Sequence, residues 1–195
     1  MGPEALAALL ARPAAASSDF ELNPGRAGPD PATLRPAAVL VPVWQQPGGA
    51  RVILTKRSSR LKHHPGQIAF PGGKTDPGET AEDTALRETE EEIGLPRAQV
   101  TLLGRLPEHV TATGYRMTPV LAHVTGAFAP RPEAGEVDEV FSVPLAHLLD
   151  PAQFRIERRR WRGEWRRYYA VPWGPYYIWG ATARILRGLA DRAAR

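Results

Sequence analysis

Residues 70–95 read FPGGKTDPGETAEDTALRETEEEIGL, a glycine- and proline-rich segment followed by strong helix formers. Thr80 to Ile93 contains no glycine or proline, and Gly94 and Pro96 follow it. These features predict a helix over residues 80–93 that ends at Gly94. The glycines before it predict a tight loop, in which backbone amides and carbonyls can lie close to a ligand.

Three glutamates fall on one face of this predicted helix. At about 100° per residue, Glu88, Glu91 and Glu92 lie within roughly 100° of one another. Another face carries residues that can pack against a sheet: Ala85, Leu86, Thr89 and Ile93. Neighbouring carboxylates repel and raise one another's pKa, and a divalent cation such as Mg²⁺ or Mn²⁺ would remove this repulsion. The alternative is a solvated acidic face that binds nothing.

Composition excludes some classes of protein. A chain of 195 residues with 43% hydrophobic and 24% charged residues suits one globular domain. The lack of cysteine excludes disulfides, thiol catalysis and zinc–thiolate sites. No apolar run reaches the roughly 18 residues that span a bilayer, so we expect no membrane segment and a cytoplasmic protein. The net charge of +4 suits an anionic substrate or nucleic acid.

Apolar runs and turn residues on both sides of this segment predict strands. The predicted strands are residues 37–44, 51–56, 100–106, 118–124, 137–143 and 154–159, the first two forming a hairpin. Residues 181–194 predict a closing helix. Residues 1–36 read as a lead-in, extended over 24–36, in which 3–12 are compatible with a short helix. Strands mixed with two main helices predict an α+β fold with a mixed sheet, in a single domain over residues 37–195.

A fixed pattern of residues runs through the loop and the helix. It is Gly, five residues, Glu, seven residues, Arg-Glu, an apolar residue, any residue, Glu-Glu, any residue, Gly and an apolar residue. The chain fills it with Gly73, Glu79, Arg87-Glu88, Thr89, Glu91-Glu92, Gly94 and Leu95. This pattern resembles the signature of the Nudix hydrolase family, and every fixed position matches. Thr89 stands where an aliphatic residue is usual, but its methyl group can still pack. The resemblance implies a Nudix-like α/β/α sandwich.

A second block lies just before the signature. It reads Ile53-Leu54-Thr55-Lys56-Arg57-Ser58, then Lys62, Gly66 and Phe70-Pro71-Gly72-Gly73. This block resembles the coenzyme A pyrophosphatases of the same family. Lys62 stands where those proteins have arginine, which keeps the charge but loses the bidentate fork. Ile53 in place of leucine changes only packing.

The resemblance implies a reaction and its residues. The reaction is hydrolysis of the diphosphate bond of coenzyme A or a derivative, giving adenosine 3′,5′-bisphosphate and 4′-phosphopantetheine, with Mg²⁺ or Mn²⁺ as cofactor. The implied catalytic residues are Arg87, Glu88, Glu91 and Glu92. The implied metal ligands are Glu88, Glu92, Glu91 and the carbonyl of Gly73. The general base is either a carboxylate of this cluster or one from outside it, Glu136 or Glu139, for which ordinary surface charge is the alternative.

Coenzyme A carries a 3′-phosphate besides its diphosphate, so its pocket should be basic. The predicted substrate-binding residues are Lys56, Arg57, Arg60, Lys62, Gly66, Phe70 and Gly72. His63 and His64 add to the basic density and are not needed as metal ligands. For any single one of these cations, a solvated loop is the alternative.

Residues 155–167 hold seven arginines, two glutamates and two tryptophans. They could bind nucleic acid through phosphate contacts and stacking, but a hairpin with one solvated face is favoured, and we expect a small-molecule partner and no nucleic acid. An aromatic group further on is interpreted as core and sheet packing: Trp173, Tyr176, Tyr177 and Trp179.

Two other functions compete with the coenzyme A reading. One is a Nudix hydrolase of ADP-ribose or nucleoside triphosphates, against which residues 56–70 argue. The other is a non-catalytic Nudix-fold module that binds nucleotide or RNA. That module should have an eroded glutamate cluster, whereas the cluster in this chain is intact.

Overall fold

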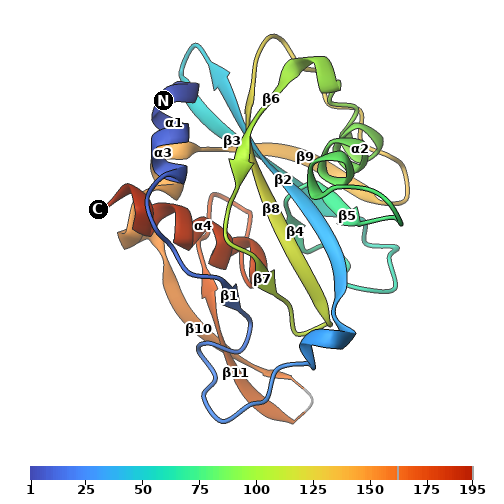
Figure 1. Ribbon diagram of the computed structural model, residues 1–195, viewed down its shortest axis with the longest axis vertical. Helices are drawn as coiled ribbons and strands as arrows, with labels where there is room; N and C mark the ends of the chain where they lie inside the picture. Colours follow the sequence, from blue (N-terminus) through green and yellow to red (C-terminus); the bar gives the residue numbers. More distant parts are fainter. Residues whose placement is uncertain (162, 195) are drawn as a thin grey trace.

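Helices cover both faces of a central mixed β-sheet in the computed structural model, which describes residues 1–161 and 163–194 (Figure 1). One face is covered by α2 (Ala81–Ile93). The other is covered by α1 (Pro3–Leu10), α3 (Leu145–Leu148) and α4 (Ala181–Ala193). The predicted α+β class, with an α/β/α sandwich around a mixed sheet, is confirmed.

Among the described residues, nine strands form the central sheet. They are β1 (Ser17–Ser18), β2 (Arg35–Gln46), β3 (Gly49–Arg57), β4 (Ile68–Ala69), β5 (Gly72–Lys74), β6 (Val100–Arg105), β7 (His109–Val110), β8 (Tyr115–Val124) and β9 (Val137–Pro144). Their order is β1-β7-β8-β2-β3-β4, with β5 on β2, β6 on β8 and β9 on β3. The pairs β2–β8 and β1–β7 are parallel, and the other pairs are antiparallel.

Strand β2 lies at the centre of the sheet and separates two hydrophobic layers. Successive side chains of a strand point to opposite faces. Val39 and Val41 therefore pack in the layer that contains α1, α3 and α4, whereas Ala38 and Leu40 pack in the layer that contains α2. The apolar run predicted as a buried strand is thus buried on both faces.

Helix α2 is fixed at both ends. The Thr80 hydroxyl accepts a hydrogen bond from the Asp83 amide at 3.1 Å, and the Asp83 carboxylate accepts one from the Thr80 amide at 3.3 Å, which forms a capping box. Gly94, at φ 71°, ends the helix in the left-handed conformation that glycine adopts readily. Ala85 and Ile93 are fully buried, so α2 is held firmly against the sheet.

The N-terminal segment packs on this core. Leu6 and Leu9 of α1 are buried in the same layer as α4. Reciprocal hydrogen bonds also join the C-terminal ends of α1 and α4. The Arg12 side chain donates to the carbonyl of Arg192, and the Arg192 side chain donates to the carbonyls of Leu9 and Leu10. Each guanidinium thereby satisfies carbonyls that a helix end leaves unpaired. Within the described part of the chain, no helix is long and apolar enough to cross a membrane.

A separate two-stranded hairpin projects from the sandwich (Figure 1). It consists of β10 (Arg155–Trp161) and β11 (Glu164–Ala170). The predicted hairpin is present, but residues 155–160 are exposed at six successive positions, so solvent reaches both faces of β10 and not one as predicted. The physical reason is that neither hydrophobic layer includes a side chain of β10 among the described residues, so no packed layer covers its faces. Arg162, one of the seven arginines of this stretch, lies outside the described residues.

Most predicted elements are present with ends shifted by a few residues. The main differences are short elements: β4 and β5 lie in the segment predicted as a loop, and β1, β7 and α3 were not predicted. Strands of two or three residues are too short to show a periodic pattern. Leu86, predicted on the packing face of α2, is only half-buried, and Tyr177, predicted as packing, is 45% exposed.

Candidate active site

Glycines of β5 bring the backbone against the glutamates of α2. Strand β5 pairs with β2, which places Gly73 opposite Ala38. A Cβ atom on Gly73 would lie 2.5 Å from both carboxylate oxygens of Glu88. On Gly72, at φ 148°, a Cβ would lie 2.5 Å from the Cα of Val39. Only glycine allows this close approach of the strand to the helix.

The carboxylate of Glu92 is buried against this backbone. Glu92 is only 5% exposed, and its Oε2 accepts a hydrogen bond from the Gly72 amide at 3.1 Å. Desolvation raises the pKa of Glu92 from 4.5 to about 7, although the Gly72 hydrogen bond and the charge of Arg57 oppose the rise. A buried carboxylate so poorly compensated is a strong candidate for a cation ligand.

Glu88 lies beside Glu92 at the same backbone. Its side chain is mostly buried, and desolvation raises its pKa, while the hydrogen bond from Arg87 and the charge of that residue lower it. Contrary to the expectation from helix spacing, repulsion between carboxylates contributes less to this rise than burial does. Spacing on a helix does not show how deeply each side chain is buried.

Arg87 links four acidic residues. Its guanidinium donates two hydrogen bonds to Glu79, at 2.7 and 3.0 Å, and single ones to Glu88 at 3.0 Å and Glu91 at 3.1 Å. It also donates to the carbonyl of Lys74 in β5 and lies 3.8 Å from Asp76. The hydrogen bond from Arg87 is the main cause that lowers the pKa of Glu79 to about 2. Arg87 therefore holds the β5 segment and the acidic face of α2 together.

The three predicted metal ligands have different surroundings. Glu88 and Glu92 lie at the Gly72–Gly73 backbone, whereas the Glu91 side chain is 59% exposed and bound to Arg87. In residues 1–161 and 163–194, no three His, Asp or Glu side chains already converge as a metal shell. Glu88 and Glu92, whose pKa values are raised by burial despite Arg87 and Arg57, nevertheless supply hard oxygen donors beside a glycine with no Cβ. This donor set fits Mg²⁺ or Mn²⁺.

The two outside candidates for the general base differ in position. Glu136 is close enough for its charge to raise the pKa of both Glu88 and Glu92. Glu139 accepts a hydrogen bond from the hydroxyl of Tyr176, whose ring stacks on Phe141 at 3.6 Å. The charge of Glu136 therefore acts on the site, whereas the Glu139 carboxylate is hydrogen-bonded to Tyr176.

The basic block forms a loop beside the glutamates. Hydrogen bonds close it, from the Arg57 amide to the Gln67 carbonyl at 2.9 Å and from the Gly66 amide to the Arg57 carbonyl at 3.0 Å. Arg57 interacts with the charge of Glu92. Arg60 and Lys62 are exposed on the loop. Cations are thus available next to the buried carboxylates.

The cations of this loop have few acidic partners. Among the residues that the structure describes, no ion pair involves any of the four predicted cations Lys56, Arg57, Arg60 and Lys62. Lys56 and His63 complete the block at its two ends, Lys56 half-buried and His63 exposed. The loop therefore has positive charge that is free to meet an anion.

Phe70 and Glu79 differ from what sequence reasoning assigned to them. Phe70, predicted to bind substrate, is 3% exposed in the hydrophobic core, which does not favour such a contact. Glu79 is a fixed position of the signature to which no role was assigned, and in the structure it is the main partner of Arg87. Its fixed position eight residues before Arg87 was the available signal.

Comparisons with known proteins identify the family of this chain. The family profile described as NUDIX domain matches residues 33–164. The uncharacterized Nudix hydrolase NudL of Shigella flexneri serotype 5b is 37% identical over 174 residues, which cover 89% of this chain and 90% of that protein. The NudL protein of Escherichia coli K12 is 39% identical over 157 residues, covering 80% and 81%.

Solved structures show the same fold. The Nudix hydrolase RenU of M. smegmatis superposes with a TM-score of 0.51 at 30% identity, covering 58% of this chain and 72% of that one. A C. elegans Ap4A hydrolase complex has a TM-score of 0.50 at 22% identity, covering 56% and 80%, which is a likeness of fold alone. Since the family profile spans most of the sequence and relatives above 30% identity cover most of their length, this chain belongs to the Nudix hydrolase family.

Proposed function

We propose that this protein hydrolyses the diphosphate bond of coenzyme A or its derivatives to adenosine 3′,5′-bisphosphate and 4′-phosphopantetheine. The observation that carries the proposal is the position of the basic loop, residues 56–66, where the charge of Arg57 acts on the buried Glu92 carboxylate. The NudL relatives are uncharacterized, so the substrate is inferred from the site itself.

The carboxylates are proposed to hold Mg²⁺ or Mn²⁺. Glu88 and Glu92 would be the main ligands, with Glu91 and the carbonyl of Gly73 as further ones. A bound divalent cation would neutralise the diphosphate and lower the pKa of water. Glu91 would have to turn away from Arg87, a small movement for a side chain that is 59% exposed.

The chain's own residues would position the reacting groups. Arg87 orients Glu88 through their hydrogen bond and fixes the helix to β5 through Glu79 and the Lys74 carbonyl. The proton of the attacking water would pass to a carboxylate of the cluster. Glu136 is the better placed of the two outside alternatives, because its charge acts on both Glu88 and Glu92.

The basic loop supports coenzyme A as the substrate. Coenzyme A combines a diphosphate with a 3′-phosphate and therefore carries more negative charge than ADP-ribose. Among the four cations of the loop, Arg57 is the one whose charge acts on Glu92, and it suits the diphosphate, whereas the exposed Arg60 and Lys62 suit the additional phosphate. ADP-ribose gives these outer cations nothing to bind.

A substrate panel tests this proposal. Coenzyme A, 3′-dephospho-coenzyme A, ADP-ribose and ATP are assayed at equal concentration with Mg²⁺ and with Mn²⁺, and products are separated by chromatography. We expect the highest kcat/KM for coenzyme A, with 3′-dephospho-coenzyme A below it. Turnover of ADP-ribose as fast as or faster than that of coenzyme A would overturn the proposed substrate. RNA binding without hydrolysis of any of these compounds would overturn the proposed hydrolase activity.

A further inference from the structure

A serine, a histidine and an aspartate lie in line at the edge of the sheet, away from the glutamate cluster. The Ser17 hydroxyl lies 2.9 Å from His109 Nδ1, and His109 Nε2 lies 3.1 Å from Asp19 Oδ1. Parallel pairing of β1 with β7 places Ser17 directly opposite His109, so the geometry follows from the sheet register. The diphosphate chemistry proposed above uses none of these three residues.

With His109 neutral, the hydrogen bonds of this trio define one assignment of its protons. Asp19 Oδ2 accepts a hydrogen bond from the Ala112 amide at 2.7 Å, which orients the carboxylate. Burial would raise the pKa of Asp19, but the hydrogen bonds from His109 and from the Ala112 amide lower it, so that it lies below its ordinary value. An ionised Asp19 accepts the N–H of His109 Nε2, and the lone pair of Nδ1 is left to accept the Ser17 proton.

This arrangement has the proton roles of a Ser-His-Asp triad. The imidazole is turned round relative to the serine proteases, because Nδ1 and not Nε2 faces the hydroxyl. Either ring nitrogen is a competent base when the other one donates to a carboxylate. His109 is fully buried, so its ring is held in place by packing and excludes bulk water from the hydrogen bond.

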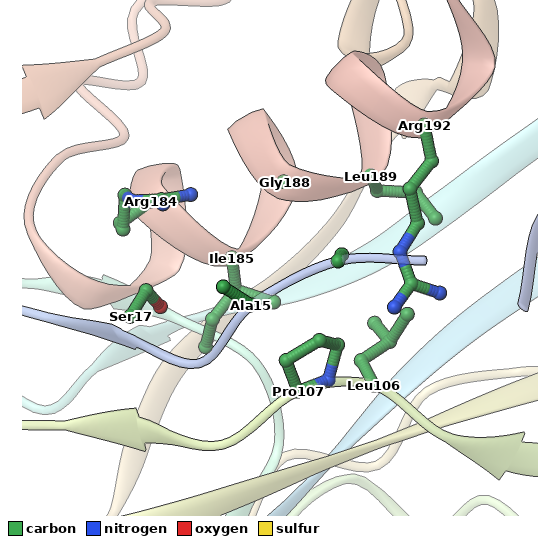
Figure 2. Close-up of a pocket in the computed structure, with 10 residues that line it drawn as sticks. Ala15, Ser17, Leu106, Pro107, Arg184, Ile185, Gly188, Leu189 and Arg192 are labelled. Carbon is green, nitrogen blue, oxygen red and sulfur yellow. The ribbon is translucent and has the colours of Figure 1, made fainter. Parts of the chain in front are cut away.

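A pocket opens beside Ser17. Its cavity volume is about 30 Å³, and a single water needs roughly 10–15 Å³ on this measure, so an acyl group of about two carbons fits. Figure 2 shows Ser17 at one end of the pocket, with Leu106, Pro107, Ile185 and Leu189 along its apolar wall. A short acyl chain would find an apolar surface there.

We propose that Ser17 is a nucleophile that accepts short acyl groups from activated esters, with His109 as the base and Asp19 as a positioning residue. With p-nitrophenyl acetate, a bond forms between Ser17 Oγ and the acetyl carbon. The bond from that carbon to the phenolate oxygen breaks, and p-nitrophenolate leaves with the electron pair. The hydroxyl proton moves to His109 Nδ1. This site is independent of the Nudix reaction.

The test uses the full-length chain, p-nitrophenyl acetate and peptide mapping of the acetyl adduct. We expect a burst of p-nitrophenolate close to one equivalent and an adduct on Ser17. Ser17→Ala should abolish the burst, and Asp19→Asn should slow it by about 100-fold or more with its amplitude unchanged. The matched control is Ser18→Ala, because Ser18 is the neighbour on β1 and its hydroxyl accepts a hydrogen bond from the Phe20 amide.

A further variant separates this activity from the diphosphate reaction. Glu92→Gln should keep the full burst while losing coenzyme A hydrolysis, and Ser17→Ala should do the reverse. An acetyl adduct on a residue other than Ser17 in the parent protein would overturn the proposal. This measurement does not depend on the folding of any variant. A burst of equal rate in Ser17→Ala would overturn it as well.

Discussion

The Glu92 carboxylate accepts a hydrogen bond from the Gly72 amide at 3.1 Å, although the two residues are 20 positions apart in the chain. This contact joins α2 to the glycine-rich strand β5 and buries a negative charge that Arg57 only partly compensates. An uncompensated buried carboxylate costs stability unless it is protonated or binds a cation. The site is therefore organised to take up positive charge.

The stability of the cation-free protein should depend on the protonation of Glu92. Its pKa is about 7 in the folded chain and 4.5 ordinarily, so between these values the folded state binds more protons than the unfolded state. The free energy of unfolding should then fall as the pH rises from about 4.5 to about 7. In EDTA, Glu92→Gln should be more stable than the parent protein at pH 8, by up to about 3 kcal/mol.

Urea unfolding at pH 5 and pH 8 measures this difference. Glu90→Gln is the matched control, since Glu90 lies on the same helix but is exposed and pairs with Arg97. If Glu92→Gln and the parent protein differed in free energy of unfolding by the same amount at both pH values, protonation of Glu92 would not control stability.

Gly73→Ala should remove activity while the fold persists. The added Cβ would lie 2.5 Å from both carboxylate oxygens of Glu88, so that side chain must move. A displacement of about 1 Å at a catalytic group can cost 100-fold in rate, and we expect at least that loss in kcat. Gly48→Ala serves as control, because a Cβ there meets nothing within 4 Å and the backbone does not have a positive φ. Similar activity of the two variants would show that Glu88 does not need its present position.

Arg87→Lys should lower kcat more than stability. Lysine keeps the charge but cannot reproduce the two hydrogen bonds to Glu79 together with those to Glu88 and Glu91. Residues that orient metal ligands usually account for about 10- to 100-fold in activity, and we expect a loss in that range. Arg105→Lys is the control, since Arg105 makes a two-point contact with Glu82 on the exposed side of α2. Equal losses in both variants would contradict a specific role for Arg87.

Charge removal from the basic loop should weaken binding of the 3′-phosphate. For coenzyme A, we expect Arg60→Ala and Lys62→Ala each to raise KM by about 3- to 10-fold, with little change in kcat. For 3′-dephospho-coenzyme A, the same variants should change KM much less. Steady-state kinetics on both substrates measures the contrast, with Arg97→Ala as a control for charge alone. Equal effects on both substrates would place the two cations elsewhere than at the 3′-phosphate.

Sequence patterns predicted the main elements because long helices and strands have a clear period and marked ends. The α2 helix is the best example, since its boundaries depend on a Thr80 cap and a Gly94 end that are local in the chain. Helix spacing also predicted correctly that Glu88, Glu91 and Glu92 share a side of α2. It could not show that Glu92 is buried and Glu91 exposed, because the depth of each side chain depends on where β5 lies.

Contacts between distant segments were beyond prediction. The pairing of β1 with β7 brings Ser17 to His109, 92 residues away, and each of these strands has only two residues. Neither strand carries an alternation that a pattern could detect. Phe70 is a related case: it lies in the block just before the signature, but its side chain is buried in the core, which does not favour the predicted contact with substrate.

The role of Glu92 is measured most directly by the rate of coenzyme A hydrolysis with saturating Mg²⁺ or Mn²⁺ in three proteins, the parent, Glu92→Gln and Glu90→Gln. We predict adenosine 3′,5′-bisphosphate and 4′-phosphopantetheine as products, a kcat lower by about 1,000-fold in Glu92→Gln, equivalent to roughly 4 kcal/mol, and an unchanged kcat in Glu90→Gln. Undiminished hydrolysis by Glu92→Gln would show that the Glu92 carboxylate is not needed for the reaction.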